Sequence, residues 1–106
     1  TEVAQAGLFL ANNGLNPISG ERVLSAEQNR TVLALMSTCG LYDECGRFAV
    51  RVGIPAKSGV SGVMLGIVPG RCAIACYGPA LGAKGNSVAG MAMLELLAAE
   101  LDWSVY

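Results

Sequence analysis

The chain has 106 residues and a net charge of −1, and hydrophobic residues make up 53% of it while charged residues make up only 14%. Its length fits one domain, and its apolar excess over a typical soluble domain indicates that other protein surface covers part of it. Every apolar run is interrupted before the roughly 18 residues of a membrane span, and no basic cluster is present, so we expect neither a membrane nor a nucleic acid partner.

The N-terminal residues and the cysteines bear on the compartment. The first residues lack the basic start and the long apolar stretch of a secretory signal. No Cys-x-x-Cys pair occurs and the chain has no histidine, so zinc-finger spacing is absent. We therefore interpret the cysteines as reduced core thiols and expect a cytoplasmic protein. They are Cys39, Cys45, Cys72 and Cys76.

The chain begins with a predicted helix over residues 1–11. Its apolar residues are dense, and it ends at Asn12-Asn13-Gly14, where glycine supplies the left-handed conformation of a helix end. Residues 15–24 contain two turn signals, Asn16-Pro17 and Ser19-Gly20, and are predicted to form a surface loop.

A second helix is predicted from Ser25 to Gly40. Ser25 and Gln28 have the spacing of a capping box, in which each side chain binds the other residue's exposed backbone N–H. Four apolar residues recur at helical spacing and predict a buried stripe that implies no cofactor: Val32, Leu35, Met36 and Cys39.

A strand is predicted over residues 48–52. Phe48, Val50 and Val52 alternate with Ala49 and Arg51, which is the period of a strand with one buried face. Gly53 follows and ends the run.

A hairpin is predicted after that strand. Residues 59–68 and 72–77 are apolar on both faces, and Pro69-Gly70-Arg71 separates them, which favours two antiparallel strands with both faces covered. Gly62 and Gly66 are two pleats apart on one face of the first strand, so we expect another backbone or a ligand to approach closely there.

The last predicted helix begins at Asn86 or Ser87 as its N-cap and is largely buried. Its apolar residues repeat at helical spacing: Met93, Leu94, Leu97, Ala98 and Leu101. The order of helix, helix, strand, hairpin and helix predicts an α+β fold, an antiparallel sheet with helices packed against it.

Two absences limit the chemistry that this chain can perform alone. Without histidine it has no Ser-His-Asp or Cys-His site and no His-ligated metal. It also has no Ser-x-x-Lys motif, which is the nucleophile pair of penicillin-recognising enzymes. The chain therefore contains no credible nucleophile.

Two short patterns are candidates for part of a site. Lys57-Ser58-Gly59-Val60 resembles the Lys-Thr-Gly box of β-lactamase-like enzymes, although an exposed lysine before a turn glycine is an alternative interpretation. Tyr42 follows a helix end at Gly40, and taken alone it is typical of a rim aromatic whose hydroxyl meets water.

A longer pattern connects these residues. The chain resembles the C-terminal region of the bacterial and mitochondrial glutaminases from about Val3 to Tyr106. The segments that carry the resemblance are Leu10-Ala11-Asn12-x-Gly14, Thr38-Cys39-Gly40-Leu41-Tyr42, the run from Gly46 to Val60, Gly85-Asn86-Ser87 and Ser104-Val105-Tyr106. The resemblance implies that residues 1–106 are the C-terminal part of a glutaminase catalytic domain with a fold similar to β-lactamases.

The resemblance also implies a reaction and two site residues. In that family a serine of a Ser-x-x-Lys motif attacks the side-chain amide of L-glutamine, releasing ammonia and then L-glutamate through an acyl-enzyme. Tyr42 matches the tyrosine that contacts nucleophile and substrate, and Val60 matches the valine whose backbone N–H serves the oxyanion hole. A homo-oligomer is implied, with no metal and no organic cofactor. The nucleophile belongs to an N-terminal part that is absent here and against which this chain packs.

Three segments depart from the family pattern. Family members usually have an acidic residue at Arg47, glycines at Ser61-Gly62-Val63 and Trp-Ser-Pro at Tyr77-Gly78-Pro79. Tyr42 and Val60 keep their motif context, so the expected site is unchanged.

Other interpretations stay open at this point. The chain is alternatively part of another β-lactamase-like serine hydrolase, such as a peptidase or esterase, or a non-catalytic C-terminal fragment or assembly module. Lys84 and Asn86 are a possible anion site near a helix start, although a solvated lysine and an N-cap asparagine explain them more simply.

Overall fold

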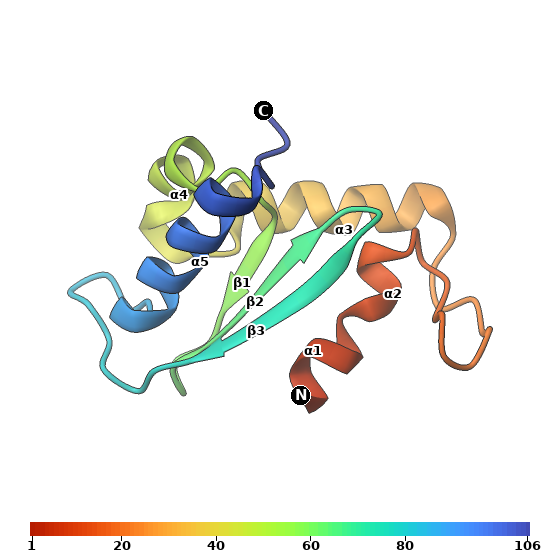
Figure 1. Cartoon of the computed structure of the whole chain (residues 1–106), viewed down its shortest axis with the longest axis horizontal. Coiled ribbons are helices and arrows are strands. Elements are labelled where there is room, and N and C mark those ends of the chain that lie inside the picture. Colours follow the sequence, from red (N-terminus) through yellow and green to blue (C-terminus); the bar gives the residue numbers. More distant parts are fainter.

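The computed structural model describes residues 1–106 and has an α+β architecture (Figure 1). Helices pack against a three-stranded antiparallel sheet, which confirms the predicted fold class. In chain order the elements are α1 (Glu2–Ala6), α2 (Leu8–Ala11), α3 (Ala26–Cys39), the short 3-10 helix η1 (Tyr42–Glu44), α4 (Cys45–Arg51), β1 (Ala56–Ser58), β2 (Val63–Val68), β3 (Cys72–Tyr77) and α5 (Val88–Leu101).

The sheet has the strand order β1-β2-β3, and both neighbouring pairs are antiparallel. The predicted hairpin is confirmed, with Val63 opposite Tyr77 and Val68 opposite Cys72. Its first strand is shorter than predicted, because residues 59–62 form a turn and β2 begins at Val63. At Gly62 the backbone has φ +96°, and a Cβ would lie 2.4 Å from the carbonyl oxygen of Gly78. Only glycine, which has no Cβ, can be accommodated where these two backbone segments approach each other.

The close approach predicted at the other glycine of this hairpin is also present. A Cβ on Gly66 would lie 2.9 Å from Cδ1 of Ile54 and 3.4 Å from Cδ2 of Leu94. The neighbours of Gly66 are therefore core side chains. The prediction that Gly62 and Gly66 share one strand face is wrong, because Gly62 precedes β2.

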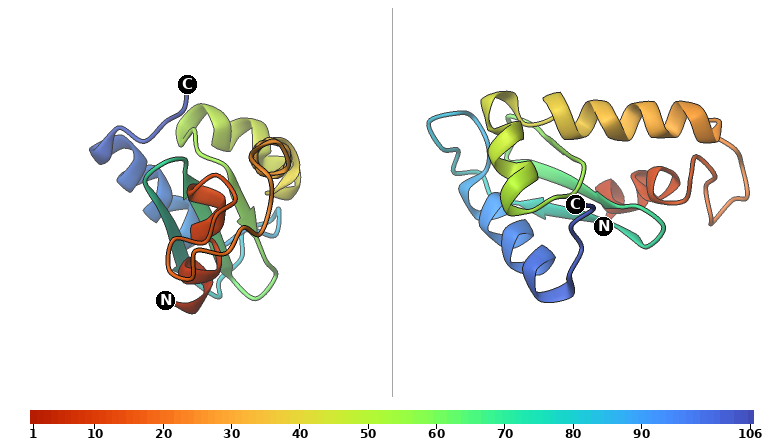
Figure 2. Two further views of the ribbon diagram at one scale, coloured as in Figure 1. Left: turned by 90° about the vertical axis from the view of Figure 1, so that its right-hand side faces the viewer. Right: turned by 90° about the horizontal axis from the view of Figure 1, so that it is seen from above.

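Both faces of the sheet are covered, as predicted. Figure 2 shows α5 and α3 on opposite sides of the sheet in both of its views. One face packs under α4 and α5 through a cluster that includes Met64, Phe48 and Leu94. The other face packs against α2 and α3 through a smaller cluster that includes Ile67 and Met36. Burial of these side chains is the main source of stability.

The strand predicted at residues 48–52 is wrong, because residues 48–51 belong to the helix α4 and Val52 is its C-cap. Cys45, Phe48 and Val52 are buried, which is helical spacing, whereas Val50 is 88% exposed. A short apolar run is compatible with both the strand period and the helical period, and packing in the core favours the helical one. The strand that precedes the hairpin is β1, over the Lys57-Ser58 pattern.

The first helix is divided at Gly7, which ends α1 and begins α2. A Cβ on Gly7 would lie 2.9 Å from a methyl group of Leu65. The sheet therefore packs directly on the backbone at this point, and the helix is less regular than its apolar pattern predicts.

The two long helices begin where the sequence predicts. The backbone N–H of Gln28 donates to Oγ of Ser25 at 3.1 Å and the N–H of Ser25 donates to Oε1 of Gln28 at 3.0 Å, so the capping box is present. The buried stripe of α3 is only partly confirmed, since Met36 is buried while Leu35 and Cys39 are exposed.

Ser87 is the N-cap of α5, and its Oγ accepts from the N–H of Gly90 at 3.0 Å. Of the two predicted caps, Ser87 is thus the right one. Asn86 has a different role, described below.

None of the four cysteines forms a disulfide. Cys45 and Cys76 are buried and Cys39 is exposed, so the prediction of core thiols holds for only part of the set. Burial raises the pKa of the Cys76 thiol, and it raises that of Cys72 despite the opposing charge of Arg71. None of the helices combines the length and apolar character that crossing a membrane requires.

Candidate functional site

The candidate site begins where α3 ends. Gly40 closes α3, and its carbonyl oxygen accepts from the N–H of Ser58 in β1 at 3.1 Å. A Cβ on Gly40 would lie 2.0 Å from the carbonyl oxygen of Ala56. Because only glycine allows this approach, the end of α3 and the Lys57-Ser58 strand lie directly against each other.

Tyr42 follows this crossing in a backbone conformation that non-glycine residues rarely take. Its φ is +53°, in the left-handed region, and its side chain is 48% exposed. A hydrogen bond stabilises the turn around Tyr42, because the N–H of Leu41 donates to Sγ of Cys45 at 3.2 Å. A strained residue of this kind persists only where surrounding contacts impose it.

Lys57 lies beside Tyr42, so the structure brings together the two short patterns that the sequence singled out. Its Nζ is 5.4 Å from the centroid of the Tyr42 ring, within cation–π range. The same ammonium donates to the carbonyl oxygen of Ser58. Lys57 thus holds the Tyr42 ring against β1, although the two residues are 15 positions apart in the sequence.

Val60 lies in the turn that joins β1 to β2. The N–H of Gly59 donates to the carbonyl oxygen of Val63 at 2.9 Å, and the N–H of Gly62 donates to that of Gly59 at 3.0 Å. Between them the N–H of Val60 donates to no group of the chain, and its side chain is 76% exposed. A backbone donor that is held in a tight turn and left unpaired suits an oxyanion.

Asn86 is a residue of this region whose role the sequence did not reveal. It is buried, and its Nδ2 donates to the carbonyl oxygen of Leu41 at 3.0 Å and to Oε2 of Glu44 at 2.5 Å. It therefore ties the segment before α5 to the turn that carries Tyr42. The interpretation of Asn86 as an N-cap is wrong, because Ser87 fills that position.

The segment before α5 also touches Tyr42 directly. A Cβ on Gly85 would lie 3.6 Å from Cδ2 and Cε2 of the Tyr42 ring. Lys84, next to it, is exposed. Contacts across more than 40 positions, such as Asn86 with Leu41, leave no local pattern in a sequence, and the Gly85-Asn86-Ser87 motif was the one signal available.

No group of three or more Cys, Asp or Glu side chains is placed to hold a metal ion. The candidate site contains Tyr42 and Lys57, which lie against each other, and the turn at Val60 that follows β1. It offers a phenol, a cation and a backbone donor, and it lacks a nucleophile of its own.

A family model described as "Glutaminase" matches residues 1–106. Among curated relatives, the glutaminase of Pseudomonas entomophila is 54% identical over 105 residues, which are 99% of this chain and 34% of the relative. That of Clostridium tetani is 51% identical over 105 residues, again 99% of this chain and 34% of the relative. The chain thus spans about a third of the length of these relatives.

Solved structures give the same picture. A Bacillus subtilis glutaminase, described as a covalent complex with 5-oxo-L-norleucine formed by reaction with 6-diazo-5-oxo-L-norleucine, superposes with a TM-score of 0.95 at 40% identity. The match covers 99% of this chain and 38% of that one. A Bacillus glutaminase studied in 4.3M NaCl superposes with a TM-score of 0.94 at 41% identity, over 98% of this chain and 37% of its own.

Proposed function

Because the chain belongs to the glutaminase family, we propose that it is the C-terminal third of a glutaminase that hydrolyses L-glutamine to L-glutamate and ammonia through a serine acyl-enzyme. The observation that carries this proposal is the superposition at a TM-score of 0.95 on a glutaminase described as covalently modified by 6-diazo-5-oxo-L-norleucine. Covalent modification by such a compound requires a nucleophile, and catalysis through an acyl-enzyme requires one as well.

In this proposal Tyr42 and Val60 are the site residues of this chain. Tyr42 contacts the nucleophile and the substrate, and it moves a proton during acyl transfer. Its strained backbone and its contact with Lys57 support this role, since both fix the direction of the phenol. Val60 supplies its backbone N–H to the oxyanion, and the unpaired state of that N–H in a tight turn supports the assignment.

The rest of the protein supplies the serine and lysine of the Ser-x-x-Lys motif, which this chain lacks. Two features support packing against such a part. The outer edge of β3 faces no further strand of the chain, and α5 exposes Met93, Leu96 and Leu101. An unpaired strand edge and an apolar helix face are surfaces that proteins usually cover.

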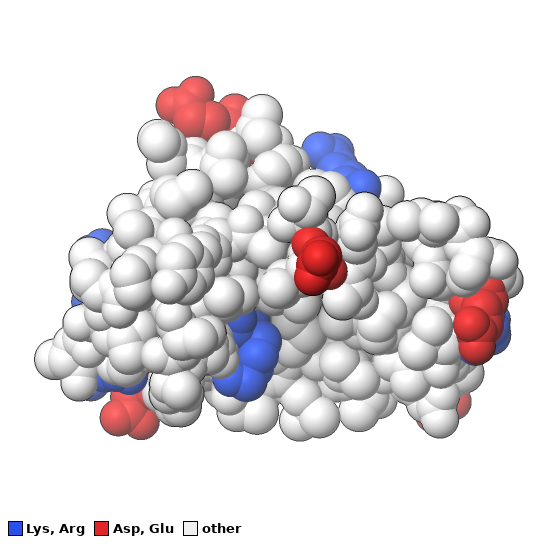
Figure 3. Space-filling view, turned by 90° about the horizontal axis from the view of Figure 1, so that it is seen from below, with Lys and Arg blue, Asp and Glu red and all other residues white.

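The assembled enzyme is further proposed to be a cytoplasmic homo-oligomer. The four free thiols fit a reducing compartment. Most of the face seen in Figure 3 is uncharged, with charged side chains scattered over it, which fits contact with other protein surface.

The test is complementation with a relative. The chain is joined to the preceding two thirds of the Pseudomonas entomophila glutaminase, and ammonia release from L-glutamine is measured for this chimera and for the 106-residue chain alone. We expect the chimera to be active and the chain alone to be inactive. Ammonia release by the chain alone would refute the division of the site.

Two further outcomes separate the alternatives. A folded chimera that cleaves esters or peptides but not L-glutamine would favour another β-lactamase-like serine hydrolase. A folded chimera without hydrolytic activity, beside an active parent enzyme, would favour a non-catalytic module.

A further inference from the structure

A pocket that the proposed reaction does not use lies between α4, α5 and the segment before α5. Its volume is about 170 Å³, and none of Tyr42, Lys57 and Val60 lines it. Four apolar side chains contribute to its wall: Phe48, Val52, Val88 and Met91. The pocket therefore suits a compact ligand with an apolar portion.

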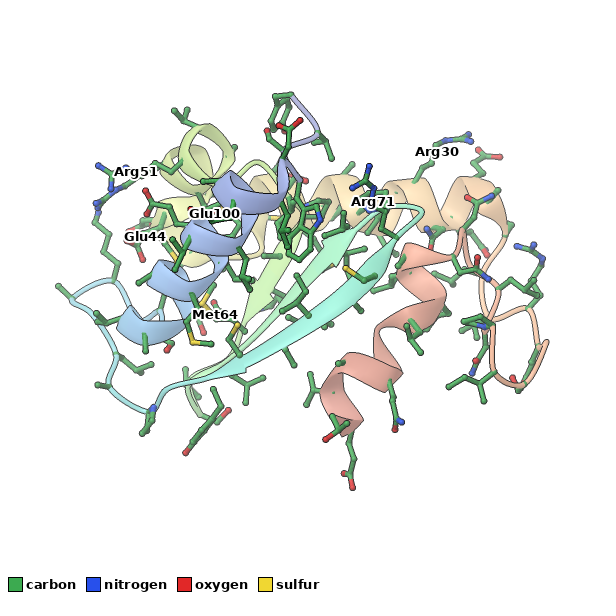
Figure 4. The ribbon with its side chains drawn as sticks, viewed as in Figure 1. Arg30, Glu44, Arg51, Met64, Arg71 and Glu100 are labelled. Atoms are coloured by element: carbon green, nitrogen blue, oxygen red, sulfur yellow. The ribbon has the colours of Figure 1, made fainter.

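Four charged side chains line the same pocket: Glu44, Arg47, Arg51 and Glu95. Figure 4 shows Arg51 and Glu44 at the same end of the molecule, beside α4. Nη1 of Arg51 lies 4.0 Å from Oε1 of Glu95, and this is the one ion pair of the chain. These two charges thus compensate each other.

The remaining two charges are not compensated by one another. Arg47 takes part in no ion pair and no side-chain hydrogen bond. Glu44 accepts a hydrogen bond from the amide of Asn86 but has no cation within ion-pair distance. The pocket thus offers an unpaired guanidinium and a carboxylate that has no cation partner, three positions apart in the sequence.

We propose that this pocket binds a free α-amino acid with an apolar side chain. A guanidinium recognises a carboxylate through two parallel N–H···O bonds, so the ligand's carboxylate binds Arg47. Its ammonium binds Glu44, and its side chain packs on Phe48 and Met91. An inorganic anion satisfies only Arg47 and leaves the carboxylate and the apolar wall unused.

The proposal rests on Arg47 and Glu44, and none of Tyr42, Lys57 and Val60 lines the pocket. It is tested by binding alone, so its failure and the failure of the proposed glutaminase reaction are distinguishable.

The first test compares matched ligands by NMR on the ¹⁵N-labelled chain. L-Leucine is expected to bind with a dissociation constant on the order of 1 mM, since the charged groups are partly solvated. 4-Methylpentanoate, which lacks the ammonium, L-leucinamide, which lacks the carboxylate, and inorganic phosphate are expected to bind at least tenfold more weakly. The shifts should be confined to α4, the start of α5 and the segment before it.

The second test uses variants of the pocket. Arg47→Met and Glu44→Gln should each weaken L-leucine at least tenfold, while Arg30→Met should not change it. Arg30 lies on α3, and Figure 4 shows it far from Glu44 and Arg51. Arg47 is exposed, so its variant keeps the fold.

Each contrary result overturns the proposal. If L-leucine causes no shifts, the pocket does not bind amino acids. If phosphate or 4-methylpentanoate binds as tightly as L-leucine, the site recognises anions and not zwitterions. Equal affinity of Arg47→Met and the unchanged chain removes Arg47 from the site.

Discussion

Tyr42 differs from an ordinary surface aromatic in how it is held. Its left-handed backbone costs on the order of 1–3 kcal/mol, and the hydrogen bonds around Leu41 compensate for that cost. Lys57 and the segment at Gly85 both lie against the ring. This arrangement supports the proposal that the turn directs the phenol of Tyr42.

We expect Tyr42→Phe in the active chimera to lower kcat by about 10²–10⁴, the usual effect of losing a general acid–base group. The melting temperature should stay near that of the unchanged chimera, because the ring and its contacts are kept. Both quantities are measured on the same preparation. A fully active variant would show that the hydroxyl takes no part in the reaction.

Val60 is expected to act through its backbone and not through its side chain. Val60→Ile in the chimera should keep activity within about tenfold, while Val60→Pro removes the N–H donor and should lower kcat by ~10² or more. Circular dichroism checks that both variants are folded. Equal activity of the two would exclude the backbone of Val60 from the oxyanion hole.

Among the elements, α4 shows how packing selects one of two possible periods. Phe48 and Val52 point into the core cluster, and Val50 points to solvent. As a strand, the same residues would have placed Phe48, Val50 and Val52 on one face. The helix buries the aromatic ring together with Leu94 of α5 and leaves Arg47 and Arg51 at the pocket.

This arrangement predicts very different costs for two neighbouring truncations. Phe48→Ala should lower the free energy of unfolding by about 3–5 kcal/mol, because it leaves a cavity in the core. Val50→Ala should change it by no more than about 0.5 kcal/mol. Urea unfolding of the chain measures both. Similar costs at the two positions would contradict the helical assignment.

At the scale of the whole molecule, the exposed apolar residues of α5 are the main feature left unexplained by the chain itself. Leu96 is 63% exposed, and Met93 and Leu101 on the same helix are exposed as well. Exposed apolar side chains grouped on one helix usually mark a surface that other protein covers. Since the chain spans about a third of its relatives, the remaining part is the proposed cover.

Leu96→Lys should therefore leave the melting temperature of the chain unchanged and weaken its binding to the separately expressed preceding segment at least tenfold. Isothermal titration calorimetry measures that binding. Ile18→Lys, at an exposed apolar residue of the loop before α3, is the matched control. Equal affinities of the two variants would place the covered surface elsewhere.

The sequence by itself determined the features that depend on near neighbours. The capping box at Ser25 and Gln28, the hairpin of β2 and β3 and the start of α5 each follow from residues a few positions apart. A helix cap or a tight turn is satisfied locally, so its residues carry a readable signal. The long glutaminase-like pattern likewise placed the chain in its family before the structure was known.

Only the tertiary structure decided which of two local options was used and which distant residues meet. Residues 45–51 form a helix, and Lys57 lies over the ring of Tyr42. The buried side chain of Asn86 donates a hydrogen bond to the carbonyl oxygen of Leu41. The physical reason is the same in each case. Burial and long-range hydrogen bonds depend on neighbours that the fold supplies, and a short stretch of sequence does not contain them.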